Sequence, residues 1–257
     1  MTIDLPDRSE FLIQTGWLNA AGMLGFAPPP TWPIVDAPVA FITNPISYAA
    51  RPPASNHGCL AFPGGILLHT GWPNPGFRQV LSRFRHRWER SPVPVWVHLL
   101  AEHSAEVDAM VRVLEEVEGV TAIEISLLPQ MNEMEKFELV KVARGELPLI
   151  LNVPLDQVGA GWVSRAATEG VSAISLAAPH GMLVGEDGRA ISGRLYGPAL
   201  LPLALQAVGK LNAYDLPVIA GCGVYDRHGF ESMLKAGATA VQLDTVLWRG
   251  WESASRG

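Results

Sequence analysis

Three polar side chains at the ends of apolar runs are candidates for catalysis. His180 follows the run AISLAAP, His69 ends the run GILLH, and Ser126 lies near the end of AIEISLL. An imidazole titrates near neutral pH and can act as a general acid or base. His180 and His69 also have a structural interpretation, as loop histidines that bond backbone groups. His98 lies inside the run VWVHLLA and is interpreted as a packed core residue.

Two further strand ends carry groups suited to anion binding. One is the glycine-flanked turn Gly221, Cys222 and Gly223, and the other is the pair Asp244 and Thr245. Glycines let backbone N–H groups come close to an anion such as a phosphate. Glycines at a strand end also serve plain tight turning, so both interpretations stay open.

The elements that must position these groups are eight short aliphatic runs bounded by Gly and Pro. They read GWLNAAG, APVAFITN, VPVWVHLLA, AIEISLL, PLILNVPL, AISLAAP, PVIAGCGV and AVQLDTVL. Helical patterns lie between most of them; the clearest is 104–119, which we expect Ser104 to cap and Gly119 to end. Runs this apolar are typical of a parallel sheet covered on its outer face. The sequence predicts an α/β fold, one (β/α)8 TIM barrel domain over residues 1–257.

Two segments interrupt the alternation of strand and helix. Residues 59–70 predict a hairpin inserted after the second strand, and residues 180–194 predict a long polar loop after the sixth. Long loops in a compact domain usually serve a site or a lid. In this barrel class the active site lies at the carboxyl ends of the strands, and a phosphate commonly binds between the loops after strands seven and eight.

Composition excludes several classes of function. The 48% of hydrophobic residues and 17% of charged ones predict a globular protein, and the net charge of −6 disfavours nucleic acid as a partner. The two cysteines, Cys59 and Cys222, are too few for a disulfide framework, so we expect a cytoplasmic protein. No run of about 18 apolar residues predicts a membrane span. The spacing of histidines and acids matches no metal-ligand pattern.

The C-terminal third resembles a known family. Two segments are similar to dihydroorotate dehydrogenases, which are FMN-dependent barrels: ISGRLYGPALLPLALQAVGKL and LPVIAGCGVYDRHGFESMLKAGATAVQLDT. A weaker similarity extends to LNAAGMLG and PLILNVP. The resemblance implies FMN over the barrel mouth, with small residues under its ring and backbone groups around its phosphate. The ring residues would be Ala20, Ala21 and Gly22, and the phosphate residues Gly221, Cys222, Gly223, Asp244 and Thr245.

The chain departs from the family's pattern at polar positions. Asn44 and Asn152 replace two lysines, although Asn152 could still hydrogen-bond a flavin carbonyl, and Ser126 begins a loop without the family's catalytic cysteine. We therefore expect a substrate other than dihydroorotate. Asp244 replaces a glycine; its carboxylate would repel a phosphate about 6 Å away by roughly 3 kcal/mol, or it would instead cap a turn that begins at Thr245.

These observations leave three hypotheses. The first is an FMN-binding oxidoreductase, related to dihydroorotate dehydrogenase, that acts on a different small molecule. The second is a flavin-free lyase or isomerase for a phosphorylated metabolite, and the third is a non-catalytic descendant that binds a ligand or partner. A homo-oligomer is compatible with all three.

Overall fold

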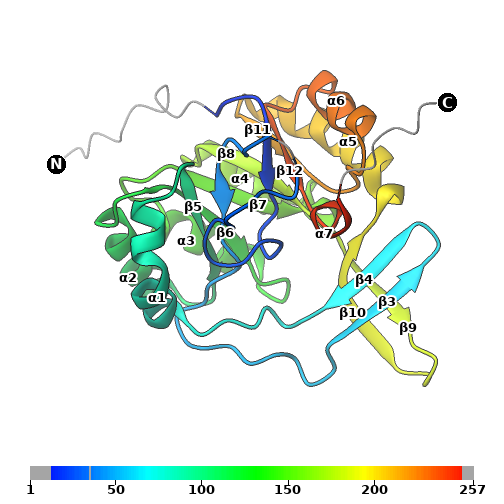
Figure 1. Ribbon diagram of the computed structural model, residues 1–257, viewed down its shortest axis with the longest axis horizontal. Helices are drawn as coiled ribbons and strands as arrows, with labels where there is room; N and C mark the ends of the chain where they lie inside the picture. The colour runs from blue at the N-terminus through cyan, green and yellow to red at the C-terminus, as the bar shows by residue number, and fades with distance from the viewer. Residues whose placement is uncertain (1–12, 35, 251–257) are drawn as a thin grey trace.

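The computed structural model describes residues 13–34 and 36–250. Within them, eight parallel strands form one sheet in the order β1-β12-β11-β8-β7-β6-β5-β2 (Figure 1). These strands are β1 (Trp17–Asn19), β2 (Phe41–Ile42), β5 (Val95–Ala101), β6 (Val120–Leu127), β7 (Leu149–Pro154), β8 (Ala173–Ala177), β11 (Val218–Ala220) and β12 (Ala240–Leu243). All eight coincide with the predicted runs, so the predicted TIM barrel is confirmed.

The seam between β1 and β2 closes the barrel. A parallel bridge joins Leu18 to Ala40, and the Asn19 side chain bonds both backbone groups of Ile42, at 3.0 Å from its N–H and 2.6 Å to its carbonyl oxygen. The Asn19 side chain thus replaces backbone hydrogen bonds between β1 and β2, which are both short.

Helices follow most of the strands and cover the outside of the barrel. The α-helices are α1 (Phe77–Glu89), α2 (Ser104–Glu115), α3 (Glu133–Val142), α4 (Gly161–Thr168), α5 (Leu201–Leu211), α6 (Arg227–Lys235) and α7 (Val246–Arg249), and short 3-10 turns span Leu155–Gln157, Pro198–Leu200 and Asn212–Tyr214. The prediction that Ser104 caps α2 is wrong: His103 is the N-cap, and its side chain makes no capping bond. Among the described helices, none has the length and apolar character that crossing a membrane requires.

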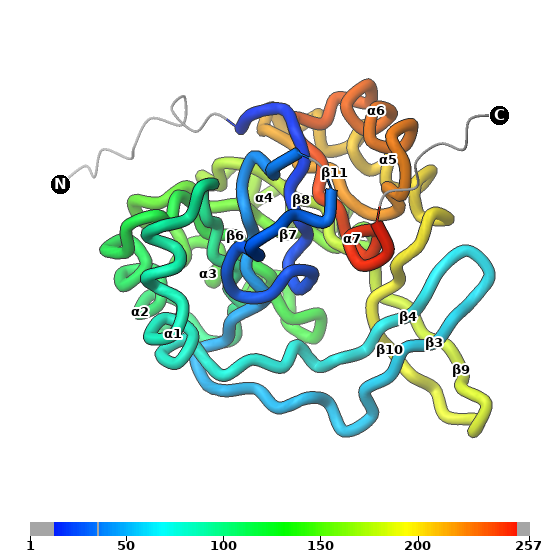
Figure 2. The backbone as a smooth tube through the Cα atoms, viewed as in Figure 1, coloured from blue at the N-terminus to red at the C-terminus, as the bar shows by residue number. Residues whose placement is uncertain are grey.

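A second, antiparallel sheet stands beside the barrel (Figures 1 and 2). Its order is β3-β4-β10-β9, with strands β3 (Gly58–Phe62), β4 (Gly65–His69), β9 (His180–Val184) and β10 (Ala190–Tyr196). The inserted hairpin is where the sequence predicts it. Residues 180–194, predicted as a long loop, form a hairpin instead. The pairing of β10 with β4 joins segments more than 100 residues apart, which no local pattern reveals.

The inside of the barrel is layered, because alternate residues of a strand face the same side. The layer nearer the amino ends of the strands is apolar and consists of Leu18, Ala40, Ile42, Trp96, Ala122, Ile150, Ala173, Ile219 and Ala240. Two residues further along five of these strands the inward side chains are polar: His98, Glu124, Asn152, Ser175 and Gln242. A polar layer therefore lies on an apolar floor, on the side of the strands' carboxyl ends.

Candidate functional site

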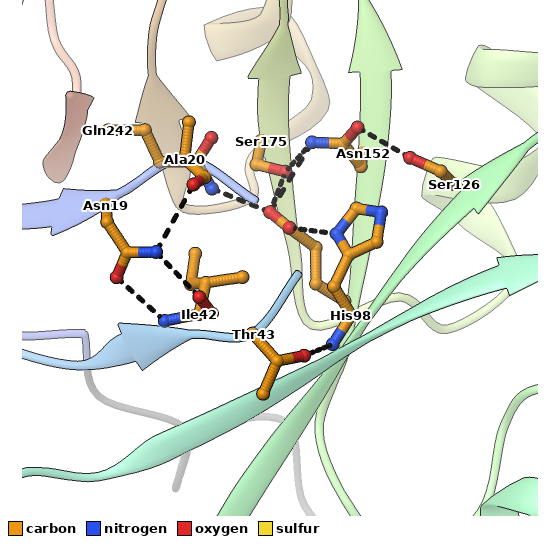
Figure 3. A network of polar contacts seen from close by, with 10 residues as sticks. Asn19, Ala20, Ile42, Thr43, His98, Ser126, Asn152, Ser175 and Gln242 are labelled. Atoms are coloured by element: carbon orange, nitrogen blue, oxygen red, sulfur yellow. Dashed lines mark hydrogen bonds and ion pairs between the residues drawn. The ribbon is translucent and has the colours of Figure 1, made fainter. Parts of the chain in front are cut away.

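The side chain of Glu124 is fully buried and bonds several residues of the polar layer. Of these partners, Figure 3 labels His98, Ser175 and Gln242. One carboxylate oxygen lies 2.5 Å from Nδ1 of His98; the other accepts hydrogen bonds from the Ser175 hydroxyl at 2.6 Å and the Gln242 amide at 2.7 Å. Asn152 donates to Ser175 at 3.0 Å. Burial on its own would raise the pKa of Glu124, but the bonds from His98, Ser175 and Gln242 outweigh it and lower that pKa. Glu124 is therefore a buried carboxylate that stays ionised.

His98 connects this carboxylate to the barrel mouth. Because Glu124 accepts the proton on Nδ1, the neutral ring carries its lone pair on Nε2. Nε2 has no hydrogen-bond partner among the described residues, and His98 lines the cavity at the mouth. A carboxylate that fixes the tautomer of an imidazole and stabilises its protonated form is the arrangement of a general base. His98 has that arrangement, with Nε2 as the reactive atom.

Groups from the second sheet form the other wall of this cavity. Arg194 and Tyr196 of β10 and Trp72, which follows β4, line the mouth together with Ala20 and Ala21. The Arg194 guanidinium donates to the Ala178 carbonyl and lies 5.5 Å from the centre of the Trp72 ring. Burial raises the pKa of Tyr196, so its phenol stays protonated. The wall thus offers a cation and a hydroxyl opposite His98.

Asp244 lies at the corner where the sequence predicts phosphate binding. Its carboxylate is buried and accepts the Thr245 hydroxyl at 3.2 Å, and the nearby backbone N–H groups of Thr245, Gly223 and Val246 favour its ionised form. Burial outweighs these bonds and raises the pKa of Asp244 to about 6. The N-cap of α7 is Thr245, with no side-chain capping bond, and the Asp244 carboxylate contacts this turn through the Thr245 hydroxyl.

The glycines of this corner are required by packing. A Cβ on Gly221 would lie 2.6 Å from the Leu176 carbonyl oxygen, and one on Gly223, whose φ is +82°, would lie 2.4 Å from the Leu201 nitrogen. Cys222 between them is buried, and burial raises the pKa of its thiol, which keeps it protonated. The close approach of backbone to backbone explains these glycines without a ligand.

The three predicted catalytic residues lie in two places, the mouth and a neighbouring cleft. Ser126 donates to Asn152 at 2.8 Å and lines the mouth, so it joins the Glu124 network. His180 and His69 line a neighbouring cleft between the second sheet and the barrel; His180 Nδ1 lies 3.2 Å from an Asp156 oxygen, and His69 Nε2 lies 3.1 Å from the Asn56 oxygen.

Two predicted cofactor residues, Asn44 and Gly22, do not line the mouth. Asn44 accepts the Gly25 N–H at 3.0 Å, which uses its side-chain oxygen within the loop after β1. Gly22, with a φ of +90°, lines the neighbouring cleft rather than the mouth. Asn44 is therefore not among the residues that the structure brings together at the mouth.

The polar layer as a whole is not predicted from the sequence. Glu124, Ser175 and Gln242 are not among the predicted site residues, and the sequence favours His98 as a core residue. The available signal was a polar residue inside an aliphatic run, repeated on neighbouring strands. A single buried polar residue is uninformative, but five at one level of a barrel indicate a network that the fold must satisfy.

Known proteins resemble the chain along most of its length. It is 26% identical over 231 residues to the catalytic subunit of dihydroorotate dehydrogenase B (NAD(+)) from Pyrococcus abyssi, covering 80% of this chain and 75% of that protein. It is 28% identical over 216 residues to the same subunit from Citrifermentans bemidjiense, covering 76% and 70%. No protein-family model matches the chain. These alignments confirm the resemblance seen in the sequence: over most of its length the chain is similar, at low identity, to the dihydroorotate dehydrogenase family.

Among solved structures, the FabK (M276A) mutant from Thermotoga maritima aligns with a TM-score of 0.41 at 22% identity, over 69% of this chain and 50% of that one. This alignment is too distant to indicate a function, and the barrel is identified from its strand order.

Proposed function

We propose that this protein is an enzyme related to the dehydrogenases, and that it binds a small polar molecule at the barrel mouth and exchanges a proton with it through Nε2 of His98. The observation that carries the proposal is the 2.5 Å contact that fixes His98 on the ionised Glu124 while the other ring nitrogen faces the cavity. Proton abstraction from a carbon next to a carbonyl, or from a hydroxyl, is the chemistry that such a base performs.

Each wall group has a role in this proposal. His98 takes the proton, and Glu124 stabilises the imidazolium that forms. The Arg194 guanidinium supplies positive charge for a carboxylate or a developing oxyanion, and the Tyr196 phenol supplies a hydrogen-bond donor. Arg194 and Tyr196 reach the mouth from β10 of the second sheet, so that sheet positions both groups.

FMN is the cofactor that the resemblance implies, and the residues present fit it only in part. Ala20 and Ala21 line the mouth, where the resemblance places the flavin ring. The buried Asp244 carboxylate lies at the corner predicted for the phosphate, and its negative charge disfavours a second anion there. The flavin-free alternative for a phosphorylated metabolite relies on the same corner and meets the same charge.

The second candidate function is a flavin-dependent oxidoreductase. The similar proteins favour it, because they are catalytic subunits of a dehydrogenase. In this candidate the flavin would supply the hydride chemistry and this chain the proton transfer. An absorption spectrum of the purified protein separates the two: bound flavin gives visible bands, and their absence before and after FMN addition excludes this candidate.

Hydrogen–deuterium exchange tests the proposed proton transfer. The protein is incubated in D2O with a panel of small 2-oxo acids and cyclic imides, and loss of carbon-bound protons is followed by NMR. We expect exchange with at least one compound, a decrease of about 100-fold or more in the His98→Asn variant, and little change in the His86→Asn control, because His86 lies exposed on α1. Exchange that His98→Asn leaves intact, or no exchange across the panel, would contradict the proposal.

A further inference from the structure

Arg194 of β10 is a buried cation without a negative partner in the described part of the chain. The residue is 8% exposed, and its guanidinium donates a hydrogen bond to the Ala178 carbonyl. Within residues 13–34 and 36–250, no carboxylate lies within ion-pair distance of this guanidinium. Burial lowers the pKa of the Arg194 side chain, but a guanidinium stays protonated in proteins. Because an unpaired buried charge is costly, this arginine indicates an anionic ligand.

A second arginine on the same cleft provides a contrast. Arg51 and Arg194 both line the cleft between the second sheet and the barrel. Arg51 forms an ion pair with Glu102 and donates to the Gly71 carbonyl at 2.7 Å. The charge of Arg51 is therefore balanced within the chain, and the charge of Arg194 is left for a ligand.

Arg194 lies where the mouth and this cleft meet. The mouth, which His98 lines, has a volume of about 50 Å³, and the cleft has a volume of about 320 Å³. Both cavities are lined by Ala21, Trp72, Arg194 and Tyr196. The mouth has room for a small group only, whereas the volume of the cleft is within the usual range for ligand pockets. A ligand that reaches His98 would therefore place most of its atoms in the cleft.

The lining of the cleft favours an apolar ligand body. Its apolar residues include Met23, Leu68, Trp72 and Leu128. The Arg194 guanidinium lies over the Trp72 ring, 5.5 Å from the ring centre, so the cation is held at the edge of an apolar surface. Burial of an apolar body against these side chains would stabilise binding.

We propose that this protein binds a small monocarboxylate, whose carboxylate pairs with the Arg194 guanidinium and whose apolar body lies in the cleft. A carboxylate matches the planar fork of a guanidinium, which can donate two parallel hydrogen bonds to it. One guanidinium balances one negative charge, whereas a phosphate monoester carries nearly two at neutral pH. The inference rests on the proposed function only for the reactive end at His98. Binding is measured without turnover, so either proposal can fail alone.

Titration calorimetry at pH 7.5 tests the inference with three probes: 3-phenylpropanoate, its neutral match 3-phenylpropanamide, and phenyl phosphate. We expect the acid to bind at least about 10-fold more tightly than either of the others, because hydrogen bonds between charged groups are the stronger ones. Arg194→Gln keeps a donor for the Ala178 carbonyl but carries no charge, and it should lose this preference. Arg51→Gln is the matched control on the same cleft and should keep the preference, since Arg51 already pairs with Glu102.

Three results would overturn the inference. The first is an acid that does not bind the wild-type protein, or binds it no more tightly than the amide. The second is tighter binding of phenyl phosphate than of the acid. The third is a preference for the acid that Arg194→Gln leaves intact. If that variant fails to fold, Arg194→Lys keeps the charge without the planar fork and should weaken binding of the acid but not of the amide. Unchanged binding of the acid by Arg194→Lys would then overturn the inference.

Discussion

Two buried carboxylates in one barrel have pKa values shifted in opposite directions. Glu124 on β6 bonds the side chains of His98, Ser175 and Gln242, and Asp244, which follows β12, accepts the Thr245 hydroxyl and lies near backbone N–H groups. The pKa of Glu124 is lowered and that of Asp244 is raised to about 6. The difference lies in the partners: Glu124 meets His98, which can carry a positive charge, whereas Asp244 meets backbone amides and a neutral hydroxyl.

The two carboxylates differ in whether a group that can be cationic lies beside them. A carboxylate next to an imidazole orients the ring and fixes its tautomer. A carboxylate without such a partner is disfavoured as an anion by burial. Glu124 at the centre of the barrel is therefore kept ionised, whereas burial favours the neutral form of Asp244 at its edge.

The largest effect should follow from removing Glu124. Glu124→Ala leaves His98, Ser175 and Gln242 without their shared acceptor, and we expect the free energy of unfolding to fall by about 3–5 kcal/mol. Denaturant unfolding at pH 7 measures this loss. Glu102→Ala is the control, because Glu102 pairs with Arg51 at a partly exposed position and should cost under about 1 kcal/mol. Equal costs for the two variants would remove the distinction between Glu124 and an ordinary ion pair.

A smaller, pH-dependent effect should follow at Asp244. The pKa of Asp244 rises from 3.8 to about 6 on folding, so between these values the folded chain binds more protons than the unfolded one. The contribution of Asp244 to stability is therefore present at low pH and lost as pH rises through 6. Relative to Asp244→Asn, the wild-type free energy of unfolding should fall by about 2 kcal/mol between pH 4 and pH 7.

Denaturant unfolding of both proteins at four pH values from 4 to 7 measures this difference. The neighbouring Cys222, Tyr196 and Tyr225 have pKa values raised by burial, so they do not titrate in this range. A difference that does not change with pH, or that changes in the opposite direction, would show that Asp244 is stabilised as an anion in the way Glu124 is.

The sequence predicts the barrel well and its interior poorly. Aliphatic runs bounded by Gly and Pro locate all eight strands because burial on both faces demands apolar residues throughout. The same property hides which face of each strand points inward, so His98 in VWVHLLA gives no sign of its partner 26 residues away. The level at which strands align is a property of the closed barrel, and it alone brings Glu124 to Gln242 across 118 residues.

The loops after β11 and β12 show a different limit of sequence-based prediction. Gly221, Gly223, Asp244 and Thr245 mark these two neighbouring loops. The direction in which the Asp244 carboxylate points depends on side-chain torsions, which the local sequence does not determine. The second sheet is missed for a similar reason, since β10 pairs with β4 across a large separation in the chain.

The most direct test of the central claim is the tautomer of His98, measured by NMR of the protein labelled with 15N-histidine at pH 7.5 and assigned with the His98→Asn variant. The structure predicts a proton on Nδ1 and a lone pair on Nε2, with the preference lost in Glu124→Gln. A proton on Nε2 of the neutral ring, or a tautomer that Glu124→Gln leaves unchanged, would contradict the assignment of His98 as the base at the mouth.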